Sequence, residues 1–197
     1  MNDGLEGGPS LGEIRTVAVI GAGVAGRSFA LACAGAGFDV VLEDVMPANL
    51  RKAEAAYADL SATGRLRVAV TVEDAVREAD VAVDFVPDEL ESKLEIFSLI
   101  DRMAPPKTIL CTPSYALSIT DLASCVYRPE RCVAVRGELA GGEVRVLYPA
   151  AVAEGTLGAV TGFLKRLGSV VLCEVDPDVP ELMKNIGRGV NSLGHRD

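Results

Sequence analysis

Short apolar runs alternate with amphipathic stretches along most of the chain. Runs with the length and β-branched content of buried strands occur at 14–20, 40–42, 66–70, 81–86, 108–111, 132–135, 144–147 and 170–173. Stretches with helical spacing of apolar residues lie between them, at 24–36, 47–62, 72–79, 89–103, 118–125, 155–167 and 179–190. Strictly alternating strands and helices favour an α/β fold, with a mainly parallel, doubly wound sheet covered by helices on both faces.

A glycine pattern joins the first strand to the first helix. Gly21-Ala22-Gly23-Val24-Ala25-Gly26 has the spacing GxGxxG. In this setting Gly21 permits a tight turn, Gly23 lets a diphosphate approach the backbone, and Gly26 lets the helix pack closely on the strand. The amides at the start of the helix, including those of Val24 and Ala25, would hold the phosphates. The pattern predicts a Rossmann-type dinucleotide site.

An acidic residue follows at the end of the second predicted strand. Asp44 lies 18 residues after Gly26, where a carboxylate accepts hydrogen bonds from the adenosine ribose and repels a 2′-phosphate. NAD is therefore the expected cofactor. Glu43 is the neighbouring candidate, but alternation along a strand turns it to the opposite face. Three alternatives stay open: glycines that serve only the turn, a loop that has lost nucleotide binding, and FAD. FAD is disfavoured because the later chain has no second nucleotide-binding region.

Composition limits the classes of partner and compartment. The net charge of -9 offers no basic stripe for nucleic acid, and no apolar run reaches the roughly 18 residues that span a bilayer. The five cysteines form no CxxC pair and the single histidine is His195, so we expect reduced thiols, a cytoplasmic protein and no metal site. We expect a flexible leader over 1–13, without the features of a signal peptide, one NAD-binding domain over 14–178, and a closing helix and tail over 179–197.

Five stretches together resemble the NAD-binding domain of 3-hydroxyacyl-CoA dehydrogenases. They read VAVIGAGVAGRSFALACAGAGFDVVLEDV, VPDELESKLEIFSLIDRMAPPKTIL, ALSITDLA, RPERCVAV and GSVVLCEVDPDVPELMKN. In that family a helical domain follows, which forms the dimer and part of the acyl-CoA cleft. About a dozen residues follow Asn185 here, so the resemblance implies that this helical domain is absent.

The resemblance also implies cofactor contacts after the fourth strand. It matches the backbone at Phe85-Val86-Pro87 to the turn that meets the dinucleotide. It matches Asp88 and Lys93 to an acidic and a lysine position on the cofactor side. For Lys93 the alternative is an ordinary solvated helix lysine.

The catalytic positions of the family are matched poorly. The residue that bonds the substrate oxygen falls at Tyr115, and the catalytic histidine falls at Arg136. The asparagine after that histidine falls at Leu139, and the glutamate that orients it falls at Tyr148. An asparagine of the closing helix is matched by Asn185. Arginine stays protonated and cannot exchange the proton that histidine would, so the family's usual reaction should be absent or very slow.

Two interpretations of this substituted site remain. Arg136 can clamp a carboxylate or phosphate with two hydrogen bonds, while Tyr115 can act as acid and base on a small hydroxy or keto acid or an acyl substrate. A partner subunit could also complete such an oxidoreductase. Alternatively, Arg136 pairs with Glu138 or Glu143 and the tyrosines fill space. The protein would then be a catalytically inactive NAD-binding sensor or accessory subunit.

The closing helix carries apolar residues at helical spacing, namely Val179, Leu182, Met183 and Ile186. This pattern predicts a homodimer formed through that helix. The alternative is that these residues cap the domain's own core.

Overall fold

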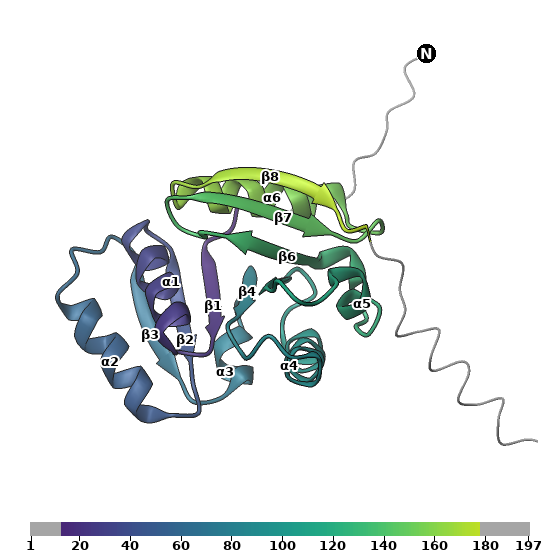
Figure 1. Cartoon of the computed structure of the whole chain (residues 1–197). Coiled ribbons are helices and arrows are strands. Elements are labelled where there is room, and N and C mark those ends of the chain that lie inside the picture. Colours follow the sequence, from purple (N-terminus) through teal and green to yellow (C-terminus); the bar gives the residue numbers. More distant parts are fainter. Residues whose placement is uncertain (1–12, 178–197) are drawn as a thin grey trace, which may run out of the picture.

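A computed structural model describes residues 13–177 of the chain. Their eight strands form one sheet in the order β3-β2-β1-β4-β5-β6-β7-β8 (Figure 1). The strands are β1 (Thr16–Ile20), β2 (Asp39–Glu43), β3 (Arg65–Ala69), β4 (Val81–Asp84), β5 (Ile109–Pro113), β6 (Cys132–Gly137), β7 (Glu143–Tyr148) and β8 (Val170–Val175). The helices are α1 (Val24–Gly35), α2 (Pro47–Ala58), α3 (Val72–Val76), α4 (Leu90–Met103), α5 (Ile119–Ala123) and α6 (Glu154–Arg166), with a 3₁₀ turn η1 (Pro129–Arg131).

Parallel pairing dominates this sheet, as the alternating pattern predicts. Neighbours from β3 to β6 are all parallel, and so are β7 and β8. The exception is the antiparallel pair β6 and β7, where Arg136 lies opposite Arg145. A short connection of five residues, 138–142, joins these two strands, which leaves no room for a crossover helix. The predicted α/β class and doubly wound sheet are confirmed.

Helices cover both faces of the sheet. One apolar cluster joins α1, α2 and α6 to one face, around Phe29, Phe38 and Phe163. The rings of Phe38 and Phe163 meet edge to face with centroids 5.0 Å apart. The other cluster joins α3, α4 and α5 to the opposite face, around Phe97 and Leu122. Burial on both faces explains why the central strands are apolar throughout rather than alternating.

The end of α2 differs from its predicted boundary. The helix ends at Ala58, four residues before the predicted end at 62. The chain must turn there to bring Gly64 against Phe38, because a Cβ at Gly64 would lie 2.1 Å from the carbonyl oxygen of Phe38. The amide of Gly64 donates to the carbonyl of Ala34 at 2.9 Å. This tertiary contact overrides the local helical pattern.

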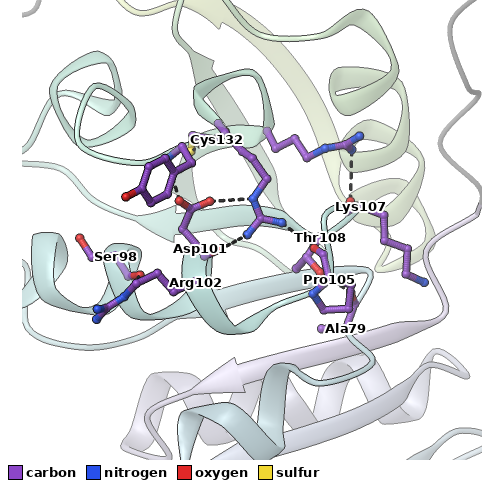
Figure 2. Close-up of polar contacts among 11 residues, drawn as sticks. Ala79, Ser98, Asp101, Arg102, Pro105, Lys107, Thr108 and Cys132 are labelled. Carbon is purple, nitrogen blue, oxygen red and sulfur yellow. Dashed lines mark hydrogen bonds and ion pairs between the residues drawn. The ribbon is translucent and has the colours of Figure 1, made fainter.

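A buried ion pair fastens the segment before β6 to the end of α4. Arg128 Nε lies 2.7 Å from Asp101 Oδ1, and their side chains are 14% and 1% exposed. The same guanidinium donates to the carbonyl oxygens of Asp101 and Pro105, and Tyr127 N donates to Asp101 Oδ2 at 2.7 Å. Figure 2 shows Asp101 and Pro105 facing this guanidinium. Because α4 runs opposite to the strands, the cluster lies at the amino-terminal edge of the sheet.

Replacing Arg128 with Ala should destabilise the domain by about 3–5 kcal/mol, because the Asp101 carboxylate would stay buried without its cation. The change is measured as the free energy of unfolding in urea. Arg102→Ala is the matched control: that exposed guanidinium donates to the carbonyl of Ser98 within α4, and its loss should cost less than about 0.5 kcal/mol. Equal losses for the two variants would contradict the fastening role.

Candidate functional site

The carboxyl ends of β1, β2, β4, β5 and β6 meet at one edge of the sheet, since these strands are parallel. The chain adds β2 and β3 on one side of β1 and the later strands on the other. The strand order therefore reverses between β1 and β4. In open α/β sheets, ligands bind in the crevice at such a reversal.

The glycine turn brings α1 directly over the end of β1. Gly21 has φ +98°, a value that suits glycine, and its amide donates to the Glu43 carbonyl at 2.8 Å. A Cβ on Gly26 would lie 1.9 Å from the carbonyl oxygen of Gly21. Both glycines are thus required for the chain to close this turn.

The start of α1 offers unpaired amides at the crevice. No side chain caps this helix end, and the first amides of a helix, here those of Val24, Ala25 and Gly26, have no partner within it. A Cβ on Gly23 would meet no atom within 4 Å, and Val24 is 76% exposed. Open space, free N–H groups and the positive end of the helix dipole together suit a diphosphate.

Asp44 binds the glycine loop as well as facing the crevice. Its Oδ2 accepts from Ala22 N at 2.8 Å and from the Asn49 amide at 3.0 Å, and its Oδ1 accepts from Met46 N at 2.7 Å. Burial acts to raise the pKa of Asp44, but these hydrogen bonds outweigh it and lower the pKa. An ionised carboxylate has about four acceptor positions, so roughly one is left for a ribose hydroxyl.

Glu43 is turned away from the glycine loop. Its side chain lies on the same face as Val41, which belongs to the cluster with α3 and α4, and Glu43 is 4% exposed. Burial, with the charge of Asp44, raises the pKa of Glu43. The structure therefore places Asp44, as the strand alternation predicts, at the side of α1.

The turn after β4 packs against the glycine loop. Phe85 lies against Gly21 and Gly26, and its ring centroid is 5.4 Å from that of Phe29. Val86 is half-buried and Pro87 is exposed beside it. The predicted backbone segment 85–87 thus borders the crevice.

The two charged side chains predicted on the cofactor side, Asp88 and Lys93, bind other groups of the protein. Asp88 Oδ2 accepts from Tyr115 N at 2.9 Å and from Ala116 N at 3.2 Å. Lys93, predicted on the cofactor side, is 1% exposed. Its ammonium lies 2.6 Å from Asp84 Oδ1 and 3.2 Å from the Pro113 carbonyl. It sits beneath the loop after β5 rather than in the crevice, and it is not the solvated lysine of the alternative.

Tyr115 and Arg136 are brought together by this loop. The Arg136 Nε donates to the carbonyl of Ser114 at 2.9 Å. The Tyr115 hydroxyl accepts from Gly137 N at 2.6 Å, and the tyrosine is 69% exposed. Both side chains therefore lie at the carboxyl ends of β5 and β6.

The guanidinium of Arg136 makes no ion pair with any carboxylate among residues 13–177. The alternative pairing with Glu138 or Glu143 is thus not the arrangement in the structure. The remaining N–H groups of this half-buried side chain suit an anionic ligand.

Tyr148 is not brought to Arg136. It packs against the cluster that contains Val133 and Val135, whereas Arg136 follows Ala134 on the other face. Leu139 is half-buried against the first of these clusters. Asn185, His195 and the predicted closing helix lie outside the described residues.

Sequence reasoning did not single out Asp84, Asn49 or Ser114 as parts of the site. Asp84 lies inside an apolar run and Asn49 within a helix, so neither carries a local signal.

Within residues 13–177, no group of three His, Cys, Asp or Glu side chains is placed to hold a metal ion. No helix in that range is both long and apolar enough to cross a bilayer.

The fold and the crevice define a dinucleotide-binding domain of the Rossmann type. Residues 16–136 match the family model of the 3-hydroxyacyl-CoA dehydrogenase NAD-binding domain. The chain belongs to this family. The predicted resemblance and the predicted cofactor, NAD, are confirmed.

Several dehydrogenases are similar to much of this chain. A probable 3-hydroxybutyryl-CoA dehydrogenase from Bacillus subtilis is 32% identical over 137 residues, which is 61% of this chain and 47% of the relative. The 5-formyl-3-hydroxy-2-methylpyridine 4-carboxylate 5-dehydrogenase of Mesorhizobium japonicum is 25% identical, over 87% of this chain and 60% of the relative. The solved 3-hydroxyacyl-CoA dehydrogenase of Archaeoglobus fulgidus has a TM-score of 0.72 at 25% identity, covering 93% of this chain and 66% of that one.

The three-way contrast among glycines tests the diphosphate site. Gly26→Ala should abolish NADH binding and lower stability, because its methyl group meets the Gly21 carbonyl. Gly23→Ala should leave the thermal midpoint of unfolding unchanged but weaken NADH binding at least tenfold, because its methyl group fills the open space at the free amides. Gly158 lies in α6, where an added Cβ would meet no atom within 4 Å. Gly158→Ala should bind NADH normally and raise the free energy of unfolding by up to about 1 kcal/mol.

Calorimetric titration with NADH and thermal unfolding measure these effects. Unchanged NADH affinity in Gly23→Ala would show that the diphosphate does not lie at this turn.

Proposed function

We propose that this protein is an NAD(H)-dependent oxidoreductase that interconverts a small hydroxy acid and the corresponding keto acid, or a related acyl substrate. The proposal rests on one observation above all. Arg136, a cation without an ion-pair partner among the described residues, and the Tyr115 hydroxyl lie together at the same edge as the glycine turn. A carboxylate and a reacting carbonyl could be held there at once.

The chemistry assigns a separate task to each side chain. NADH, when bound, supplies the hydride that reduces the carbonyl carbon. Arg136 pairs with the substrate carboxylate and fixes its orientation. The Tyr115 hydroxyl accepts a hydrogen bond from Gly137 N, so its own hydrogen is free to be donated to the developing alkoxide. The proton taken up by the alkoxide comes from the phenol, which is reprotonated from solvent. In this scheme Arg136 stands where the family has its histidine, and Tyr115 stands where the family has the residue that bonds the substrate oxygen.

The relatives support the substrate class. The Mesorhizobium japonicum enzyme is named for a pyridine carboxylate, and the Bacillus subtilis relative for a hydroxybutyryl thioester. A site with one arginine favours the free carboxylate, since that group forms a charged bidentate pair.

The alternative is a catalytically inactive NAD-binding sensor or accessory subunit. Arginine cannot replace histidine as an acid and base, and an exposed tyrosine is held less firmly than a buried one. The proposal of an oxidoreductase includes two further predictions. One is that a partner subunit completes the site. The other is a homodimer formed through the segment 179–190, with Asn185 beside the substrate. A cytoplasmic location also belongs to the proposal, and it suits five cysteines that are all free thiols.

Turnover is tested by following NADH absorbance with a panel of pyruvate, 2-oxobutyrate, acetoacetate and acetoacetyl-CoA. Tyr115→Phe should lower kcat by about 10²–10⁴-fold, as expected for loss of a general acid. Arg136→Ala should raise KM for the keto acids much more than for the thioester, because only the free acids carry the carboxylate that it binds.

Tyr127→Phe is the matched control for the tyrosine variant. Tyr127 is 87% exposed and adjoins the Asp101 cluster at the other edge of the sheet, so kcat should not change. NADH binding that stabilises the wild type by about 2.7 kcal/mol at a hundredfold excess over Kd, without turnover of any panel member, would favour the inactive sensor or accessory subunit. The absence of any thermal shift would exclude both functions.

A further inference from the structure

Charged side chains from three parts of the chain hold the backbone at the end of β5 and in the loop that follows it. Lys93 of α4 donates to the Pro113 carbonyl at 3.2 Å, and Arg136 of β6 donates to the Ser114 carbonyl at 2.9 Å. Asp88, from the turn after β4, accepts from the amides of Tyr115 and Ala116 at 2.9 and 3.2 Å. Four consecutive residues therefore each have a backbone group bound by a charged side chain.

Each of these contacts has one ionised partner. Hydrogen bonds to an ionised partner are about twice as strong as neutral ones. The pKa of Asp88 is lowered: burial acts to raise it, but the hydrogen bonds from Ser114, Tyr115 and Ala116 outweigh that effect. Asp88 is thus in the ionised form that these amides favour.

Lys93 is in turn held by a buried ion pair with Asp84. Its ammonium lies 2.6 Å from the fully buried Asp84 carboxylate, and both belong to the packed layer between α4 and the sheet. The Pro113 carbonyl receives the remaining direct contact of this ammonium. The loop is therefore tied to the interior of the domain, although Tyr115 at its tip is exposed.

Tyr115 depends on this loop for its position. At 69% exposed it has few packing contacts to orient it. Its backbone amide is bound by Asp88 and its hydroxyl accepts from Gly137 N. Polar contacts therefore hold Tyr115 at its backbone amide and at its hydroxyl.

We propose that Asp88 and Lys93 are positioning residues that fix Tyr115 and Arg136 through the loop backbone, rather than residues that contact the cofactor. The inference rests on the proposed function in assigning the acid and base role to Tyr115. It differs from the cofactor-side role that the family resemblance implies for both residues. The burial of Lys93 and the two amides on Asp88 are the observations that separate the two roles.

Asp88 is tested with a graded pair of variants. Asp88→Ala removes the acceptor, whereas Asp88→Asn keeps an amide oxygen that can accept from the same N–H groups. We expect kcat for the keto acid probe, acetoacetate, to fall at least tenfold in Asp88→Ala and less than threefold in Asp88→Asn. The NADH Kd should stay within twofold of wild type in both. Glu89→Ala, an exposed neighbour whose side chain caps nothing, is the matched control.

A second readout needs no turnover. In protein labelled with 3-fluorotyrosine, the ¹⁹F resonance of Tyr115, assigned by its loss in Tyr115→Phe, should differ from the free amino acid in the wild type. It should move to the free value in Asp88→Ala and stay in Asp88→Asn and Glu89→Ala. A wild type without turnover would contradict the proposed function, while this spectrum would still decide the positioning role.

Lys93 is tested as the double variant Asp84→Asn/Lys93→Met, because Lys93→Met alone would leave a buried carboxylate without its cation. The Tyr115 resonance should again move toward the free value while NADH binding is kept. If the double variant does not fold, the Asp88 pair decides the proposal. A tenfold weaker NADH affinity in Asp88→Ala, or an unmoved Tyr115 resonance in that folded variant, would overturn it.

Discussion

The structure depends on the contact between α1 and the turn after β1. A side chain at Gly26 would overlap the Gly21 carbonyl, with its Cβ 1.9 Å away, so the absence of a Cβ sets how close the helix can come. That approach leaves the first amides of α1 open at the reversal of strand order and lets Phe85 close over both glycines. Asp44 then joins β2 to the same turn through Ala22 N. The positions that we predict for the diphosphate and the ribose follow from this one steric constraint.

Charge is used in two ways around the crevice. Asp84 and Lys93 are buried against each other and Asp88 binds backbone amides, so these groups shape loops. Arg136 donates one N–H to the Ser114 carbonyl and forms no ion pair with a carboxylate among residues 13–177. The first three charged groups are therefore used within the protein, whereas Arg136 keeps N–H groups for a ligand. Residue type alone does not reveal which role a charged side chain has.

Much of this arrangement follows from the sequence, but only where the signal is local. The spacing of Gly21, Gly23 and Gly26 after an apolar run, with Asp44 at the next strand end, suffices to predict the tight turn between β1 and α1 and the contact of Asp44 with it. The environment of Lys93 could not be predicted, because its ammonium is bound by Asp84 and by the Pro113 carbonyl, at the ends of the adjacent strands β4 and β5. The early end of α2 likewise depends on Gly64 reaching Phe38, a contact across more than twenty residues of chain.

The central claim is that free helix amides and Asp44 hold NAD(H), with the carboxylate excluding a 2′-phosphate. Titration calorimetry of the full chain with NADH and NADPH tests it most directly. The account predicts binding of NADH and at least tenfold weaker binding of NADPH, with the preference lost in Asp44→Asn. Equal affinity for the two coenzymes, or no heat with either, would contradict it.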